Sequence, residues 1–175
     1  MRRSFSSILP LVVSLLLLTG CPYESTVPLS SPGLARIDSD LIGKWMMEDK
    51  ESKESAALTI SRFNEKELLI IISEEGREAE TLRAFVTLIG NQKFLNLQEM
   101  RGAYEDRKWM FVNYSIKDCA LTYRLVNDSL LKDRAKAGLS QKELYGFIKK
   151  NLTNKTVYDE PTTLACVKKS DGPGK

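Results

Sequence analysis

The sequence predicts a mostly β domain: an antiparallel up-and-down barrel of about eight strands, with one helix outside it in the C-terminal half. Three observations predict this fold class. Short apolar segments recur at near-regular spacing between positions 40 and 126, separated by polar or glycine-containing turns. One of them, Leu68 to Ile72, is apolar on both faces and needs cover on both sides. The segment 141–151 has helical periodicity and can supply one of these covers.

The expected strands follow in chain order. Asp40 to Met47 opens the folded part, and Ala57 to Phe63 then alternates apolar and polar residues, as a half-buried strand does. Closing the sheet into a barrel removes the exposed edges that favour aggregation. The remaining predicted strands are 68–72, 82–89, 94–97, 109–116, 119–126 and 162–168, with breaks that include 64–66, 90–91 and 117–118.

The most distinct helix signal begins at Ser140. Ser140 and Glu143 have the spacing of a capping box, and Leu139 and Leu144 are placed as a hydrophobic staple. An apolar stripe at helical spacing continues through Leu144, Phe147, Ile148 and Leu152. A shorter helix is expected at 128–136, before Gly138.

The first 20 residues have the parts of an export signal. Arg2 and Arg3 precede an apolar run, residues 8–18, that is too short to span a membrane. Leu18, Thr19 and Gly20 then lead into Cys21. This sequence resembles the lipobox of bacterial lipoproteins. The resemblance implies cleavage before Cys21, a diacylglycerol on its sulfur, and acylation of the new amine.

The same resemblance implies a location. A lipidated Cys21 anchors the chain in the bacterial cell envelope, on the periplasmic side, and the membrane is then its first partner. Pro22 rather than aspartate follows the cysteine, which in the family's sorting rule permits transfer to the outer membrane. Residues 21–39 form the lipidated cysteine and a segment rich in proline and serine, which we expect to be a flexible tether.

Charge and residue usage exclude several functions. The first 20 residues hold two of the 26 Lys and Arg and none of the 23 Asp and Glu, so the rest of the chain has a side-chain charge of +1. We therefore expect no nucleic acid partner. The chain contains no histidine, which removes the commonest catalytic base and metal ligand. We expect no enzymatic activity, no metal and no cofactor.

Two cysteines remain after lipidation, Cys119 and Cys166. Outside the cytoplasm such a pair is a candidate disulfide. The alternative is two separate buried thiols.

Gly43-Lys44-Trp45 lies at the start of the first predicted strand. It resembles the Gly-x-Trp signature of lipocalins, whose eight-stranded barrel has a helix outside it before the last strand. The resemblance implies a lipocalin-like domain over residues 40–169, followed by a loose tail at 170–175. It also implies that Trp45 plugs the closed end of the barrel, near a basic side chain such as Lys168 or Lys169. The alternative is a chance tripeptide in an unrelated β-sandwich.

A barrel of this size holds one small ligand or is filled by its own side chains. Ala84, Val86 and Leu88 share one face and are candidates to line a cavity, whereas bulky residues at 109–114 favour a filled interior. The function expected is binding of a small apolar or lipid-like molecule, or of an envelope protein. The alternative is a structural or accessory subunit of an envelope complex with a filled barrel.

Overall fold

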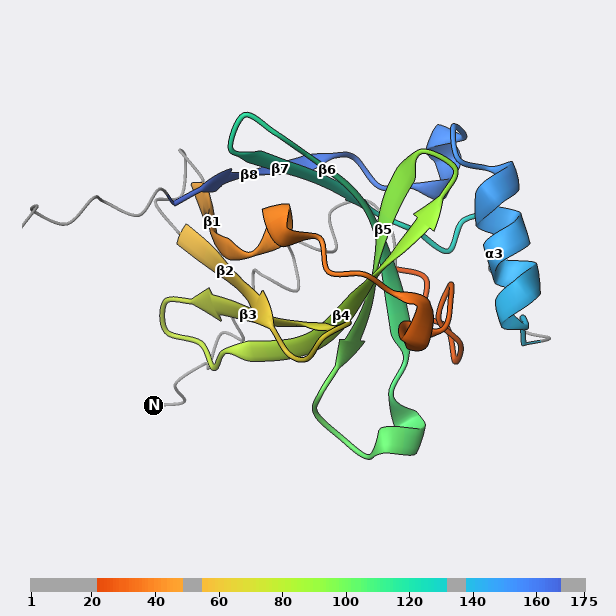
Figure 1. Cartoon of the computed structure of the whole chain (residues 1–175), viewed down its shortest axis with the longest axis horizontal. Helices are drawn as coiled ribbons and strands as arrows, with labels where there is room; N and C mark the ends of the chain where they lie inside the picture. Colours follow the sequence, from red (N-terminus) through yellow and green to blue (C-terminus); the bar gives the residue numbers. More distant parts are fainter. Residues whose placement is uncertain (1–21, 49–54, 132–137, 168–175) are drawn as a thin grey trace, which may run out of the picture.

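A computed structural model describes residues 22–48, 55–131 and 138–167 of the 175-residue chain. Its strands form one closed antiparallel barrel in which neighbours in sequence are neighbours in the sheet, with a helix outside (Figure 1). The barrel closes where Trp45 pairs with Cys166 and Met46 with Ala165. The predicted fold class, an eight-stranded up-and-down barrel with an external helix in the C-terminal half, is confirmed.

The elements are short, and most strands are linked by tight turns. The strands are β1 Gly43–Glu48, β2 Ser55–Arg62, β3 Leu68–Glu74, β4 Glu80–Ile89, β5 Gln92–Glu99, β6 Trp109–Lys117, β7 Ala120–Leu125 and β8 Thr162–Cys166. The helix is α3 Gln141–Lys150, and short 3-10 turns are η1 Pro32–Leu34, η2 Ser39–Leu41, η3 Tyr104–Asp106 and η4 Lys155–Val157.

Side chains alternate across the barrel wall and build two cores. The inner core fills the barrel and includes Trp45, Ile60 and Leu68. The outer core lies on the outside of β4, β5 and β6 and includes Phe85, Phe94 and Phe111, each fully buried. Outward-facing phenylalanines require cover, because apolar surface left in water costs about 25 cal/mol for each Å². That cover comes from α3, from the N-terminal segment and from the segments that contain Val126, Leu131, Val157 and Tyr158.

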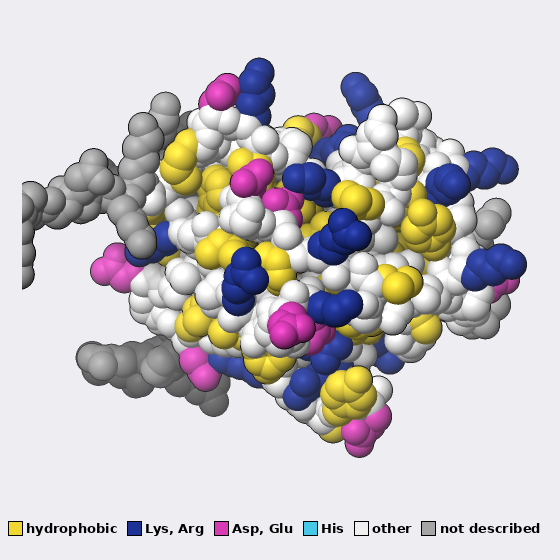
Figure 2. All heavy atoms as spheres, in the orientation of Figure 1, with side chains coloured by type: hydrophobic (Ala, Val, Ile, Leu, Met, Phe, Trp, Pro, Cys, Tyr) yellow, Lys and Arg dark blue, Asp and Glu magenta, His cyan; other side chains and the backbone are white. Residues whose placement is uncertain are grey.

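Helix α3 begins as the sequence predicted. The Ser140 hydroxyl accepts a hydrogen bond from the Glu143 backbone N–H, and the Glu143 carboxylate accepts one from the Ser140 N–H at 2.9 Å. Leu144 and Ile148 are fully buried against the barrel. Lys and Arg side chains project from the right-hand edge of the molecule, where Figure 1 places this helix (Figure 2). Of the shorter helix expected at 128–136, residues 128–131 form a turn and 132–136 lie outside the described residues.

The prediction of a flexible tether at 21–39 is wrong for the described residues 22–39. Residues 22–38, here called the N-terminal strap, pack across the outer face of the barrel (Figure 1). Tyr23, Leu29 and Ala35 are each less than 7% exposed. They recur at irregular spacing, so neither a helical nor a strand period marks them. The strap is held in place because these side chains are buried against the outer core.

Trp45 is buried inside the barrel, 4% exposed, as expected from the Gly-x-Trp signature. Its indole N–H donates to the carbonyl of Leu41 in η2 at 2.9 Å, which ties the segment before β1 across the end of the barrel. The glycine of this signature, Gly43, is required by its backbone conformation rather than by a close neighbour. A Cβ there would meet no atom within 4 Å, but the backbone has φ +152°, which favours glycine. Lys168 and Lys169 lie outside the described residues.

Cys119 and Cys166 are joined in a disulfide, with their Cα atoms 5.2 Å apart. Cys119 lies in the turn between β6 and β7, and the Cys166 N–H donates to its carbonyl at 2.9 Å. The bridge therefore fixes the last strand to the turn beside it, at the same end of the barrel as Leu41. The lipobox, residues Leu18 to Cys21, and the tail 170–175 lie outside the described residues.

Candidate functional site

The two ends of the barrel differ in how well their inward-facing side chains are covered. The closed end is the end with the turns 63–67, 90–91 and 118–119, and the open end carries the connections 75–79 and 100–108. Leu41, Ile60 and Leu68 face inward near the closed end and are at most 2% exposed. Near the open end four inward-facing residues are only partly buried, Met47, Ile72, Leu97 and Met110, whereas Leu82 and Leu125 there are at most 6% exposed. The open end thus presents a group of partly exposed apolar side chains, and near the closed end Ile116 is also partly exposed.

A partly buried polar cluster lies at the closed end. The Asp38 carboxylate, 13% exposed, accepts hydrogen bonds from the Lys93 ammonium at 2.7 Å and from the Tyr114 hydroxyl at 2.8 Å. Burial raises the pKa of Asp38, but these donors and the charge of Lys93 outweigh burial and lower its pKa overall. Burial, with the neighbouring Asp38 charge, raises the pKa of Tyr114, so the phenol remains a neutral donor.

The three residues predicted to line a ligand cavity do not lie together at the open end. Ala84 and Val86 face the interior but are 0% and 9% exposed within its packed part. Leu88 is 64% exposed, because the register pairs it with Lys93 beside the 90–91 turn, beyond the packed interior. Sequence reasoning missed the residues of the open end. Their alternation is visible in the sequence, but only the strand order shows which end stays uncovered.

Polar side chains on the outside of the barrel fix the N-terminal strap. Asn96 is fully buried; its side-chain oxygen accepts from the Leu29 N–H at 2.8 Å, and its amide nitrogen donates to the Thr87 hydroxyl at 2.9 Å. The Thr87 and Ser30 hydroxyls are 2.6 Å apart. A buried amide without partners costs about 1–3 kcal/mol. The strap therefore supplies the hydrogen bond to the Asn96 side-chain oxygen while it shields that oxygen from water.

The strap begins at the open end. Pro22 is bridged to Asn127, and the Tyr23 N–H donates to the Val126 carbonyl at 2.9 Å. Ser25 and Trp109 exchange two backbone hydrogen bonds, of 2.9 and 2.7 Å, at the start of β6. From there the strap crosses β5 and reaches Asp38 at the closed end. The first described residue thus lies beside the end where the barrel interior is uncovered.

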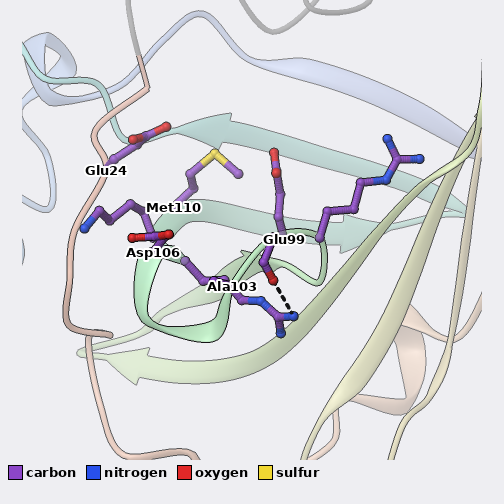
Figure 3. A pocket seen from close by; sticks show the side chains of 9 residues that line it. Glu24, Glu99, Ala103, Asp106 and Met110 are labelled. Atoms are coloured by element: carbon purple, nitrogen blue, oxygen red, sulfur yellow. Dashed lines mark hydrogen bonds between the residues drawn. The ribbon is translucent and has the colours of Figure 1, made fainter.

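A cavity of about 200 Å³ lies beside the open end. It is walled by the strap, the end of β5, the 100–108 connection and the start of β6. Figure 3 shows Glu24, Asp106 and Glu99 around the thioether of Met110. The lining residues are Glu24, Glu99, Arg101, Gly102, Ala103, Asp106, Arg107, Lys108 and Met110.

In the part of the chain that the structure describes, no three Cys, Asp or Glu side chains gather as metal ligands. The helices described there are too short or too polar to cross a bilayer. Comparisons with protein families, with curated proteins and with solved structures found no match.

Proposed function

We propose that this protein is a lipid-anchored, non-enzymatic binding protein of the bacterial envelope, whose barrel holds a small apolar or lipid-like molecule at its open end. The observation that carries the proposal is the group of partly exposed apolar side chains at the open end. Trp45 and Leu41 close one end, whereas Ile72, Leu97 and Met110 at the other remain half-buried. Apolar side chains that converge and remain partly exposed to solvent are typical of a ligand site.

The N-terminal strap supports the lipid anchor as part of this function. Pro22 follows the candidate lipidation site Cys21 directly and lies against Asn127 at the open end. A diacylglycerol on Cys21 then places the open end next to the membrane, on the periplasmic side. Each buried methylene of the anchor contributes about 0.8 kcal/mol, and two or more chains hold stably. A lipid leaving the bilayer would meet the open end first.

The second candidate is a structural or accessory role with a filled barrel. It is favoured by the closed half of the interior, where Ile60, Leu68 and Ala84 are at most 2% exposed. In that case the half-buried residues of the open end would contact an envelope protein rather than a small molecule.

The test compares two tryptophan variants on one strand. Ile72 faces the interior at the open end and Ile71 faces outward. The full chain, extracted in mild detergent, should carry a co-purified lipid-like molecule detectable by native mass spectrometry. Ile72→Trp should reduce its occupancy because the indole fills the open end, and Ile71→Trp should leave it unchanged. A wild-type protein that carries no small molecule, even after incubation with membrane lipid extract, would favour the accessory role.

A further inference from the structure

The cavity beside the open end carries charges of both signs. Its acids come from three places: Glu24 from the strap, Glu99 from the end of β5 and Asp106 from η3. Its bases are Arg101, Arg107 and Lys108. Four of its charged residues lie in the 100–108 connection, and Glu99 directly precedes it. The cavity, at about 200 Å³, is smaller than the 300–1,000 Å³ typical of drug-sized ligands. Its size suits a polar headgroup rather than a whole lipid.

These charges do not neutralise one another. Across residues 22–48, 55–131 and 138–167, no ion pair joins an acid of the cavity to one of its bases; Arg101 pairs instead with Glu78, at 2.9 Å, outside the cavity. Arg107 donates from Nη2 to the Gly102 carbonyl at 3.2 Å, while its Nε is buried without a hydrogen-bond partner among the described residues. That Nε is shielded from the cavity, but the Arg107 guanidinium lines the cavity and makes no ion pair among the described residues, so its charge is available to an anionic ligand.

We propose that this cavity binds the headgroup of a zwitterionic aminophospholipid. Arg107 and Lys108 would hold the phosphate, since guanidinium and ammonium groups are the usual phosphate donors in proteins. Glu99, Glu24 and Asp106 would accept hydrogen bonds from the ammonium group. A headgroup that carries both charges at short separation satisfies both sets, whereas an anion alone leaves the carboxylates facing it unpaired.

Two observations favour a membrane lipid over a free solute of the same chemistry. Met110 lines the cavity and, opposite Leu97, also faces the open end, so an acyl chain attached to the headgroup has an apolar path into the barrel. Glu24 lies three residues after Cys21. This proposal rests on the proposed function, because it places the headgroup next to a lipid anchor and the acyl chain in the open end.

The experiment uses the full chain, purified in mild detergent. It is titrated with three ligands: short-chain phosphatidylethanolamine, short-chain phosphatidylglycerol and water-soluble glycerophosphoethanolamine. Binding is measured by native mass spectrometry and by calorimetry. Lys108→Gln and Arg107→Gln should weaken phosphatidylethanolamine binding about tenfold, the effect of losing one charge-assisted hydrogen bond. Lys108 is included because, unlike Arg107, it does not brace the loop. Glu99→Gln should weaken phosphatidylethanolamine binding and leave phosphatidylglycerol binding unchanged.

Matched controls are Glu65→Gln and Arg62→Gln, which make the same changes at exposed positions near the closed end. They should bind all three ligands like the wild type. Equal loss of both phospholipids in Glu99→Gln, or no loss in Lys108→Gln, would overturn the proposal. If glycerophosphoethanolamine binds as tightly as phosphatidylethanolamine, the ligand of the cavity is a free solute and not a membrane lipid. Ile72→Trp separates the headgroup site from the proposed ligand site in the barrel. It should weaken binding of the lipid but not binding of glycerophosphoethanolamine. The headgroup site is therefore tested even if the open end holds no acyl chain.

Discussion

Asp38 illustrates how single, partly buried polar side chains join distant parts of this chain. It ends the N-terminal strap, yet its partners Lys93 and Tyr114 lie in β5 and β6. Asn96 does the same in the middle of the strap through Leu29 and Thr87. These hydrogen bonds would be exchanged for bonds to water if the strap left the barrel, so the polar contacts set its position while apolar burial supplies most of its stability.

The Asp38 cluster predicts a pH dependence. Because the folded-state pKa of Asp38 is lowered, its contribution to stability is present above its unfolded pKa, about 3.9, and is lost as pH falls through the folded value. Asp38→Asn should therefore destabilise the protein at pH 7, and the difference from wild type should shrink below about pH 4. Urea unfolding at several pH values measures this. Glu65→Gln, at an exposed position, is the control. If the stability difference between Asp38→Asn and wild type grows as the pH falls, the pKa of Asp38 is not lowered by folding.

Trp45 gives the second prediction at this scale. Trp45→Ala removes a side chain that is 4% exposed and its hydrogen bond to Leu41. The free energy of unfolding should fall by about 3–5 kcal/mol, the usual range for a buried large aromatic. Lys44→Ala, one residue earlier and exposed, should change it by less than about 0.5 kcal/mol. Equal urea midpoints for Trp45→Ala and wild type would mean that the indole does not seal the closed end.

At the scale of elements, the strap behaves as part of the fold. Leu29 is 1% exposed and Leu34, in the same strap, is 81% exposed. Leu29→Ala should cost about 2–5 kcal/mol, because it opens a cavity between strap and barrel. Leu34→Ala makes the same chemical change in solvent and should be neutral within about 0.5 kcal/mol. Thermal or urea unfolding of both variants decides the matter, and two equal, neutral variants would mean that the strap is not packed in solution.

The strands and α3 were predictable because their signals are local. Alternation places Ile60 inward, and the Ser140 and Glu143 capping box marks where the helix begins. The strap and the cavity were not predictable, because both depend on contacts between residues far apart in sequence. Nothing near Leu29 indicates that Asn96, 67 positions away, accepts its backbone N–H. Likewise, Glu24 and Arg107 are brought to one cavity only by the course of the strap.

At the scale of the whole molecule, the start of the strap and the cavity lie at the open end of the barrel. Pro22 and Met110 are there, while the disulfide between Cys119 and Cys166 and the plug at Trp45 hold the opposite end. The eight residues of β5 span about 25 Å at 3.4 Å per residue. If Cys21 carries the lipid, the open end lies near the bilayer. The closed end is then farther from the bilayer by a large fraction of the length of β5.

The orientation of the lipidated chain on a membrane tests the central claim most directly. Ala103→Cys labels the 100–108 connection and Glu65→Cys the 63–67 turn, and each is the only free thiol when Cys21 is lipidated and Cys119 is paired with Cys166. Nitroxide-labelled lipid headgroups in vesicles should quench a bimane at position 103 strongly and one at 65 weakly, and Cys21→Ser should abolish both effects. Stronger quenching at 65, or equal quenching at both positions, would contradict an open end held at the membrane.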